Sequence, residues 1–312
     1  MTQQRDRRWL ARAITLVEST RAEDEQAAER LLAEIAPDTG RALRVGVSGP
    51  PGVGKSTFLD ALGIHLVGRG HRVAVLAVDP SSPISGGSIL ADKTRMERLA
   101  RCDAAFIRPS PGAGALGGVA RRTREAMLVC EAAGHDVILV ETIGVGQSET
   151  DVSLMTDHFL VLALPGAGDE LQGLKKGIVE LADSIAITKA DGDNLARATQ
   201  AQADLRMALQ ILHGGAAAAP PVLLCSALQG TGIAEVWSAV EAAVARARQD
   251  GSLAARRGAQ IRAWFHRAIE ERVLQRFLTD PAVRARMHAL ELELDQGRVQ
   301  PGAAARRLVE GA

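Results

Sequence analysis

The chain has 312 residues, of which 46% are hydrophobic, and its 37 basic residues balance 37 acidic ones. This length accommodates one α/β domain of ordinary size with appendages. The neutral charge balance and the scarcity of aromatic residues (3%, with no Tyr) argue against a protein that binds nucleic acid or an anionic membrane surface.

Three isolated cysteines, Cys102, Cys130 and Cys225, form no C-x-x-C pair, which argues against a disulfide scaffold and against a structural zinc site. The first residues lack an apolar segment after their charges, and no apolar run reaches the roughly 18 residues that a transmembrane helix needs. We therefore expect a cytoplasmic protein.

Residues 1–42 are predicted to form an N-terminal helical extension. Apolar residues recur at helical spacing from Trp9 to Val17 and again from Ala27 to Ile35, which predicts two helices within residues 6–36. The second helix is predicted to begin at a capping box, Thr20-Arg21-Ala22-Glu23.

A glycine-rich loop of the form G-x-x-x-x-G-K-S follows the first predicted strand and precedes a predicted helix. In such a loop, backbone N–H groups and the positive end of the helix dipole face one phosphate. Lys55 would reach the β- and γ-phosphates, and the Ser56 hydroxyl can bind Mg²⁺. The sequence therefore predicts a site for a nucleoside triphosphate with magnesium. The predicted phosphate-binding residues are Gly49, Pro50, Pro51, Gly52, Val53, Gly54, Lys55, Ser56 and Thr57.

Residues 43–249 alternate between strands and helices. The predicted strands are residues 44–48, 72–78, 105–108, 136–141, 158–164, 184–189 and 222–226, and the predicted helices include residues 55–68, 117–133, 193–212 and 233–247. Most of the strands are continuous β-branched and Leu-rich runs, which is typical of strands covered on both faces. We predict an α/β fold with a doubly wound, mainly parallel sheet that binds its ligand at the carboxyl ends of the strands.

Three acidic residues, Asp79, Asp92 and Glu141, are candidates for a Mg²⁺ site together with Ser56. Hydrolysis of a nucleoside triphosphate needs such oxygen ligands to hold the ion at the phosphates. Position favours Asp79 and Glu141, because each ends a predicted strand beside the phosphate loop. Each of the three could instead be a helix cap or a turn residue, and position alone does not decide for Asp92.

A nucleotide-sensing switch is predicted where the fourth strand ends, at Glu141-Thr142-Ile143-Gly144. Gly144 could donate its N–H to the γ-phosphate and move when that phosphate leaves. The next residue is Val145, where such switches usually carry the glutamine that positions water, and Gln147 lies two residues further on. We therefore expect slow intrinsic hydrolysis that a partner accelerates. The predicted catalytic residues are Lys55, Asp92, Glu141 and Gly144.

Two later loops predict guanine as the base. The first has the form [N/T]-K-x-D, in which Asp191 accepts hydrogen bonds from guanine N1–H and the exocyclic amine while Lys189 lies along the base. Adenine lacks both donors in that arrangement and would leave the carboxylate unpaired. The predicted base-binding residues are Thr188, Lys189 and Asp191 in the first loop, and Ser226, Ala227 and Leu228 in a second loop that would donate a backbone N–H to the guanine oxygen.

Residues 250–312 are helical and differ in pattern from the preceding domain. Their apolar residues form one stripe from Ile261 to Leu278 and a second from Val283 to Leu294, separated by Asp280-Pro281. These helices could simply cover the sheet. Because the segment has no sheet of its own to cover, we favour a helical arm that pairs with a second copy of the chain.

Long stretches of the chain closely resemble the methylmalonyl-CoA mutase-associated GTPases, the MeaB/ArgK family of P-loop GTPases. The resemblance covers nearly the whole chain, including its helical ends. The stretches that carry it are DPSS (79–82), SGGSIL (85–90), DKTRM (92–96), FIRPS (106–110), GGV (117–119), ETIGVGQSE (141–149) and GDELQG (168–173).

The resemblance implies a homodimeric G protein that serves an adenosylcobalamin-dependent acyl-CoA mutase. Such proteins gate cofactor loading and help to protect or reactivate the mutase, without binding cobalamin themselves. It also implies that the loop ending at Asp92 is a switch whose carboxylate binds Mg²⁺. The loop over residues 168–176 would be a further switch that couples the nucleotide to the mutase, and the C-terminal arm would make the dimer.

Two positions depart from the family pattern, and two other functions stay open. Ala91 stands where Gly is usual and Thr188 where Asn is usual, which affects affinity or rate rather than class. An ATP-dependent kinase linked to amino-acid transport is a role sometimes attached to this family, and the predicted guanine loop argues against it. A nickel-insertion GTPase would often carry His-rich tracts or Cys-His clusters, which the sequence lacks.

Four cations lie in or beside the predicted switches, where one could contact the γ-phosphate or the mutase: Arg95, Arg108, Lys175 and Lys176.

Overall fold

The computed structural model describes residues 5–19, 21–78, 96–108, 118–142, 148–165, 176–216 and 219–311. The chain divides into two compact units, Met1–Arg257 and Gly258–Ala312. Among the described residues, no helix is both long enough and apolar enough to cross a membrane.

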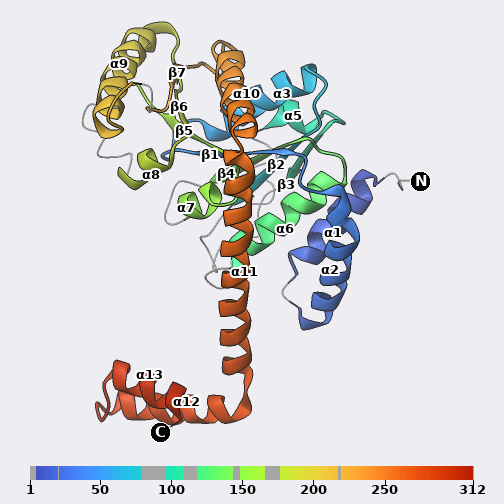
Figure 1. Cartoon of the computed structure of the whole chain (residues 1–312), viewed down its shortest axis with the longest axis vertical. Coiled ribbons are helices and arrows are strands. Elements are labelled where there is room, and N and C mark those ends of the chain that lie inside the picture. The colour runs from blue at the N-terminus through green and yellow to red at the C-terminus, as the bar shows by residue number, and fades with distance from the viewer. Residues whose placement is uncertain are drawn as a thin grey trace. The chain divides into compact units, whose positions relative to one another are not determined.

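The sheet that the structure describes has seven strands in the order β3-β2-β4-β1-β5-β6-β7, and every pair of neighbours is parallel (Figure 1). All seven predicted strands are confirmed, each within two residues at either end. Burial on both faces explains their continuous apolar runs. The strands are β1 (Leu43–Ser48), β2 (Val73–Val78), β3 (Ala105–Arg108), β4 (Val137–Thr142), β5 (His158–Ala163), β6 (Ser184–Ile187) and β7 (Val222–Leu224).

Helices cover both faces of the sheet, as a doubly wound fold requires (Figure 1). One face is covered by α3 (Lys55–Gly68), α5 (Glu97–Ala100) and α10 (Ile233–Gln249). Helices α6 (Gly118–Ala132) and α7 (Ser148–Ser153) lie on the other face, while α8 (Lys176–Leu181) packs beside β5 and α9 (Leu195–Leu212) beside β6 and β7.

The two predicted N-terminal helices are confirmed as α1 (Arg7–Val17) and α2 (Ala22–Ile35), and both pack against α6. The predicted capping box is wrong about how α2 begins. Its N-cap is Arg21, which makes no side-chain cap, and Ser19 instead donates its hydroxyl to Asp24 at 2.5 Å. Thr20 lies outside the described residues.

Alternation along β1 decides what each face of the sheet contacts. Val45 and Val47 are fully buried in the apolar core that α3 and α10 share with the sheet. Gly46, between them, faces α7, and a Cβ there would lie 2.8 Å from the side chains of both Val152 and Phe159. Glycine at this position therefore lets α7 approach β1 closely.

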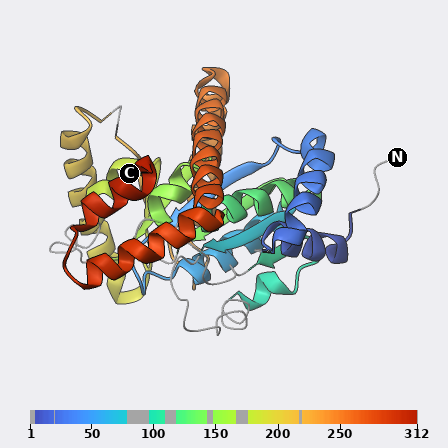
Figure 2. The ribbon, with the colours of Figure 1, turned by 90° about the horizontal axis from the view of Figure 1, so that it is seen from below.

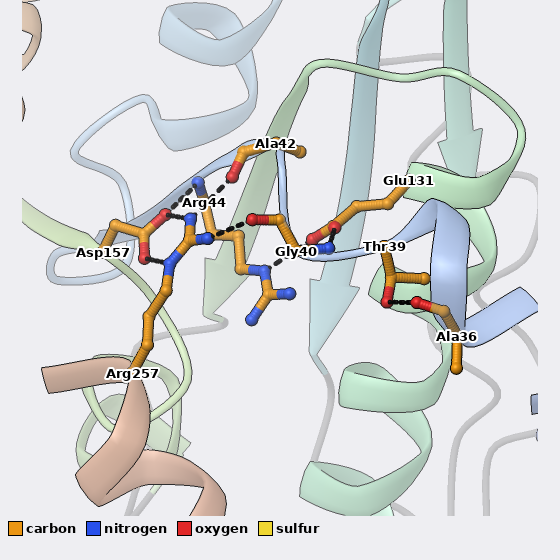
Figure 3. A network of polar contacts seen from close by, with 8 residues as sticks. All are labelled: Ala36, Thr39, Gly40, Ala42, Arg44, Glu131, Asp157 and Arg257. Carbon is orange, nitrogen blue, oxygen red and sulfur yellow. Dashed lines mark hydrogen bonds and ion pairs between the residues drawn. The ribbon is translucent and has the colours of Figure 1, made fainter. Parts of the chain in front are cut away.

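A polar cluster fixes the beginning of α11 (Ser252–Thr279) to the end of the sheet where β1 and β5 start (Figure 3). Arg257 donates to both carboxylate oxygens of Asp157 at 2.7 and 2.6 Å and to the carbonyl oxygens of Gly40 and Ala42 at 2.5 and 2.8 Å. The backbone N–H of Arg44 also donates to Asp157, at 2.9 Å. Because the Asp157 side chain is 0% exposed, removal of this guanidinium would leave a buried charge uncompensated.

The second unit holds the rest of α11 and two shorter helices, α12 (Pro281–Asp295) and α13 (Pro301–Glu310). Helices α12 and α13, red in Figure 2, lie side by side, and Arg307 donates to Glu293 between them at 2.8 Å. Asp280 caps α12 by accepting from the N–H of Ala282 at 2.8 Å, and Pro281 is the first residue of that helix. The break predicted at Asp280-Pro281 is therefore confirmed.

Candidate functional site

The phosphate loop lies between β1 and α3, at the carboxyl ends of the parallel strands. Its glycines adopt positive φ angles, 153° at Gly49, 78° at Gly52 and 92° at Gly54, which L side chains rarely adopt. At Gly49 an added Cβ would lie 2.6 Å from the carbonyl oxygen of Leu162 in β5. Glycine is therefore required there both for the turn and for the close approach to the neighbouring strand.

Lys55, the first residue of α3, places its ammonium group within the loop that precedes it. Its Nζ donates to the carbonyl oxygens of Gly49 at 2.7 Å and Pro50 at 3.2 Å, and the residue is only 8% exposed. Burial lowers the pKa of the Lys55 ammonium, and the negative charges of Glu141 and Glu149 act in the opposite direction. The loop therefore holds a cation at the position where a phosphate-binding lysine is needed.

Ser56 and Glu141 meet at the start of α3, which fits the predicted Mg²⁺ site. The Ser56 hydroxyl donates to Glu141 Oε1 at 3.2 Å, and Glu141 is 7% exposed at the end of β4. A hydroxyl and a carboxylate side by side are oxygen ligands of the kind that Mg²⁺ prefers. The other predicted ligands, Asp79 and Asp92, lie outside the described residues, as does Gly144. Within the part of the chain that the structure describes, no three His, Cys, Asp or Glu residues form a metal-binding group.

The predicted base loop is bonded directly to the phosphate loop. The Thr188 hydroxyl donates to the carbonyl oxygen of Val53 at 2.7 Å and lies 3.2 Å from that of Ala163. Lys189, with an unusual φ of 55°, donates from its Nζ to the carbonyl oxygen of Gly52 at 2.9 Å. The Thr188 hydroxyl therefore joins the predicted base loop to the phosphate loop.

The second base loop supports the first through Asp191. The Ser226 hydroxyl donates to the Asp191 carboxylate, and the backbone N–H of Ala190 donates to the carbonyl oxygen of Cys225 at 3.1 Å. Leu228 is 83% exposed, so it contributes no packing to this loop. The residues predicted from the sequence to read guanine therefore lie in two bonded loops, with the Asp191 carboxylate held in place by a hydroxyl donor.

Of the four cations near the predicted switches, Arg108 has a partner elsewhere in the fold. Its side chain donates from Nε to Glu18 at 3.1 Å, beside the end of α1. Arg95 and Lys175 lie outside the described residues. Lys176 is the first residue of α8. The contact with Glu18 gives Arg108 a structural role in docking α1.

No local sequence pattern predicts a separate role for Glu149. It lies in the first turn of α7 and is 2% exposed. Neither of its carboxylate oxygens accepts a hydrogen bond from any residue that the structure describes. Its position five residues after Gly144 could have suggested a role near the nucleotide. Its burial without a hydrogen-bond partner can be recognised only from the structure.

Comparison with known proteins places these features in a family. The family model described as methylmalonyl-CoA mutase-associated GTPase MeaB matches residues 10–282. GTPase ArgK of Escherichia coli is 51% identical, over 87% of this chain and 82% of that protein. The mitochondrial methylmalonic aciduria type A homolog of Mus musculus is 46% identical, over 96% of this chain and 75% of that protein.

Two solved structures also resemble this chain. The crystal structure of an LAO/AO transport system kinase has a TM-score of 0.75 and 40% sequence identity, and the match covers 98% of this chain and 93% of that one. HypB from Helicobacter pylori, solved in complex with nickel, has a TM-score of 0.50 at 15% identity, over 72% of this chain and 96% of that one. The second likeness shows the fold alone.

Proposed function

The chain belongs to the MeaB family of methylmalonyl-CoA mutase-associated GTPases, and we propose that it is a GTP-hydrolysing chaperone of an adenosylcobalamin-dependent acyl-CoA mutase. The observation that carries this proposal is the bonding between the two nucleotide loops, in which Thr188 donates to Val53 and Lys189 to Gly52. These contacts support a site in which recognition of the base and of the phosphates is linked. The names of the relatives support the mutase as the partner.

In this proposal the backbone N–H groups of residues 49–57 and the ammonium of Lys55 bind the phosphates. Ser56 and Glu141 would hold Mg²⁺ together with Asp79 and Asp92, and the ion would supply positive charge at the phosphates. Water attacks the γ-phosphorus while the bond to the leaving oxygen of GDP breaks. The Gly144 N–H loses its hydrogen bond when the γ-phosphate leaves. The resulting conformational change is what acts on the mutase.

The test is GTP hydrolysis with Mg²⁺, measured alone and with a purified adenosylcobalamin-dependent acyl-CoA mutase from the same organism. We expect slow turnover alone and a rise of about 10-fold or more with the mutase, equivalent to about 1.4 kcal/mol of the barrier. An adenosylcobalamin enzyme that does not act on acyl-CoA serves as the control. Unchanged turnover with the mutase would retain the GTPase and reject this mutase as its partner.

We also propose that the protein is a homodimer that pairs through α11. Apolar side chains recur every four residues on this helix, and they are exposed: Ile261 60%, Phe265 63%, Ile269 43% and Val273 62%. A stripe of this kind on a helix is typical of a surface that packs against another chain.

Sedimentation should give the mass of two chains for the wild-type protein and of one chain for Phe265→Glu, because a charge at the centre of an apolar interface is strongly unfavourable. The variant Glu270→Ala changes an exposed residue on the same helix and should leave the dimer intact. A wild-type protein with the mass of one chain would reject the proposal.

A further inference from the structure

Among the described residues of the first unit, the carboxylate of Glu149 is an unusual polar group. The residue is 2% exposed, and neither oxygen has a hydrogen-bond partner among the residues that the structure describes. Burial of an ionised group without a partner is strongly unfavourable, so such a group is rarely kept for stability. Residues that lower stability in this way are concentrated at sites where chemistry needs them.

The topology places Glu149 at the nucleotide end of the sheet. Helix α7 connects β4 to the parallel strand β5, so it runs back along the sheet from the carboxyl ends of the strands (Figure 1). Val152, one turn later in α7, packs against Gly46 in the middle of β1. Glu149 therefore lies one turn closer to the end of β1, where the phosphate loop begins.

The charges around Glu149 agree with this placement. Its negative charge acts on the Lys55 ammonium, as does that of Glu141. The two glutamates differ in their contacts, because Glu141 accepts from Ser56 whereas Glu149 accepts from none of the described residues. One carboxylate is thus positioned for the predicted ion site, and a second, uncommitted one lies near the phosphate-binding lysine.

We propose that the Glu149 carboxylate orients the attacking water and accepts its proton during GTP hydrolysis. The inference rests on the proposed function and assigns the role that Val145 does not supply. The water oxygen forms a bond to the γ-phosphorus, the bond from that phosphorus to the β-phosphate oxygen breaks, and GDP leaves with the electron pair. The water proton passes to Glu149 and then to solvent, so the products are GDP, phosphate and one proton.

The test is the variant Glu149→Gln, which has nearly the same shape but cannot accept the proton as a carboxylate does. We expect the single-turnover rate of GTP hydrolysis to fall about 10²-fold, the lower end of the usual contribution of a general base. Affinity for GDP and for a non-hydrolysable GTP analogue should stay at least as high, because a negative charge near the phosphates is removed. The melting temperature should be equal or higher, because a buried unpartnered charge is removed.

The exposed acid Glu235 on α10 provides the matched control, Glu235→Gln, which should match the wild type in all three measurements. A Glu149→Gln rate within twofold of wild type would overturn the inference and leave the GTPase intact. So would a loss of GDP affinity or of thermal stability that parallels the loss of rate, because that pattern indicates a structural role. A wild-type protein that hydrolyses no GTP, alone or with the mutase, would instead overturn the proposed function, and the inference with it.

Discussion

Replacing Lys55 with alanine is expected to lower kcat/KM for GTP hydrolysis by about 10³-fold, the upper end of the effect of removing one donor that stabilises transition-state charge. The ammonium is buried, and it is held by the Gly49 and Pro50 carbonyl oxygens at 2.7 and 3.2 Å. A nucleotide in the loop would offer this ammonium phosphate oxygens in place of those carbonyl oxygens. Because charge builds up on the phosphate oxygens as the bond breaks, loss of the cation should affect hydrolysis more than GDP binding.

The measurement is phosphate release under single-turnover conditions, with GDP affinity measured in parallel. The control is Arg69→Ala at the other end of α3, where an exposed arginine pairs with Glu241 at 3.0 Å. An exposed pair of this kind contributes little, so hydrolysis should be unchanged. Turnover retained by Lys55→Ala would show that the phosphate loop is not the hydrolytic site.

The strands and most helices could be predicted from the sequence because their signals are local. Each strand is a short apolar run bounded by turn residues, and the phosphate loop is recognised from its spacing of glycine, lysine and serine. Asp280-Pro281 marks a helix boundary, because Asp is a favoured N-cap and Pro is favoured as the first residue of a helix. The observed ends of the strands therefore differ from the predicted ends by at most two residues.

What could not be predicted depends on pairs of residues far apart in the chain. The bond from Thr188 to Val53 spans 135 positions, and that from Arg257 to Asp157 spans 100. No local pattern encodes either contact, since each depends on how two connections cross the sheet. The sequence treats Thr188 only as a departure from asparagine, whereas the fold gives its hydroxyl a definite acceptor. Glu149 is similar, because a glutamate at the start of a helix is ordinary until its burial is known.

The second large effect concerns the base. Asp191→Asn should lower affinity for GTP by about 10²- to 10³-fold, because two hydrogen bonds to a charged acceptor are lost or weakened. Asp191 is held by the Ser226 hydroxyl, and the neighbouring Lys189 is tied to Gly52 at 2.9 Å, so the loop should keep its shape in the variant. The asparagine amide now donates where the carboxylate accepted.

The same reversal predicts a gain of affinity for a different base. Xanthine has a carbonyl where guanine has its exocyclic amine, so the variant should bind xanthosine triphosphate better than GTP, whereas the wild type prefers GTP. Competition of GTP, ATP and xanthosine triphosphate for one labelled nucleotide measures all three preferences. Asp193→Asn, an exposed change two residues along the same loop, should preserve the wild-type order. A wild-type protein that prefers ATP would contradict guanine recognition and favour the kinase alternative, because adenine offers no N–H donors to the Asp191 carboxylate in that arrangement.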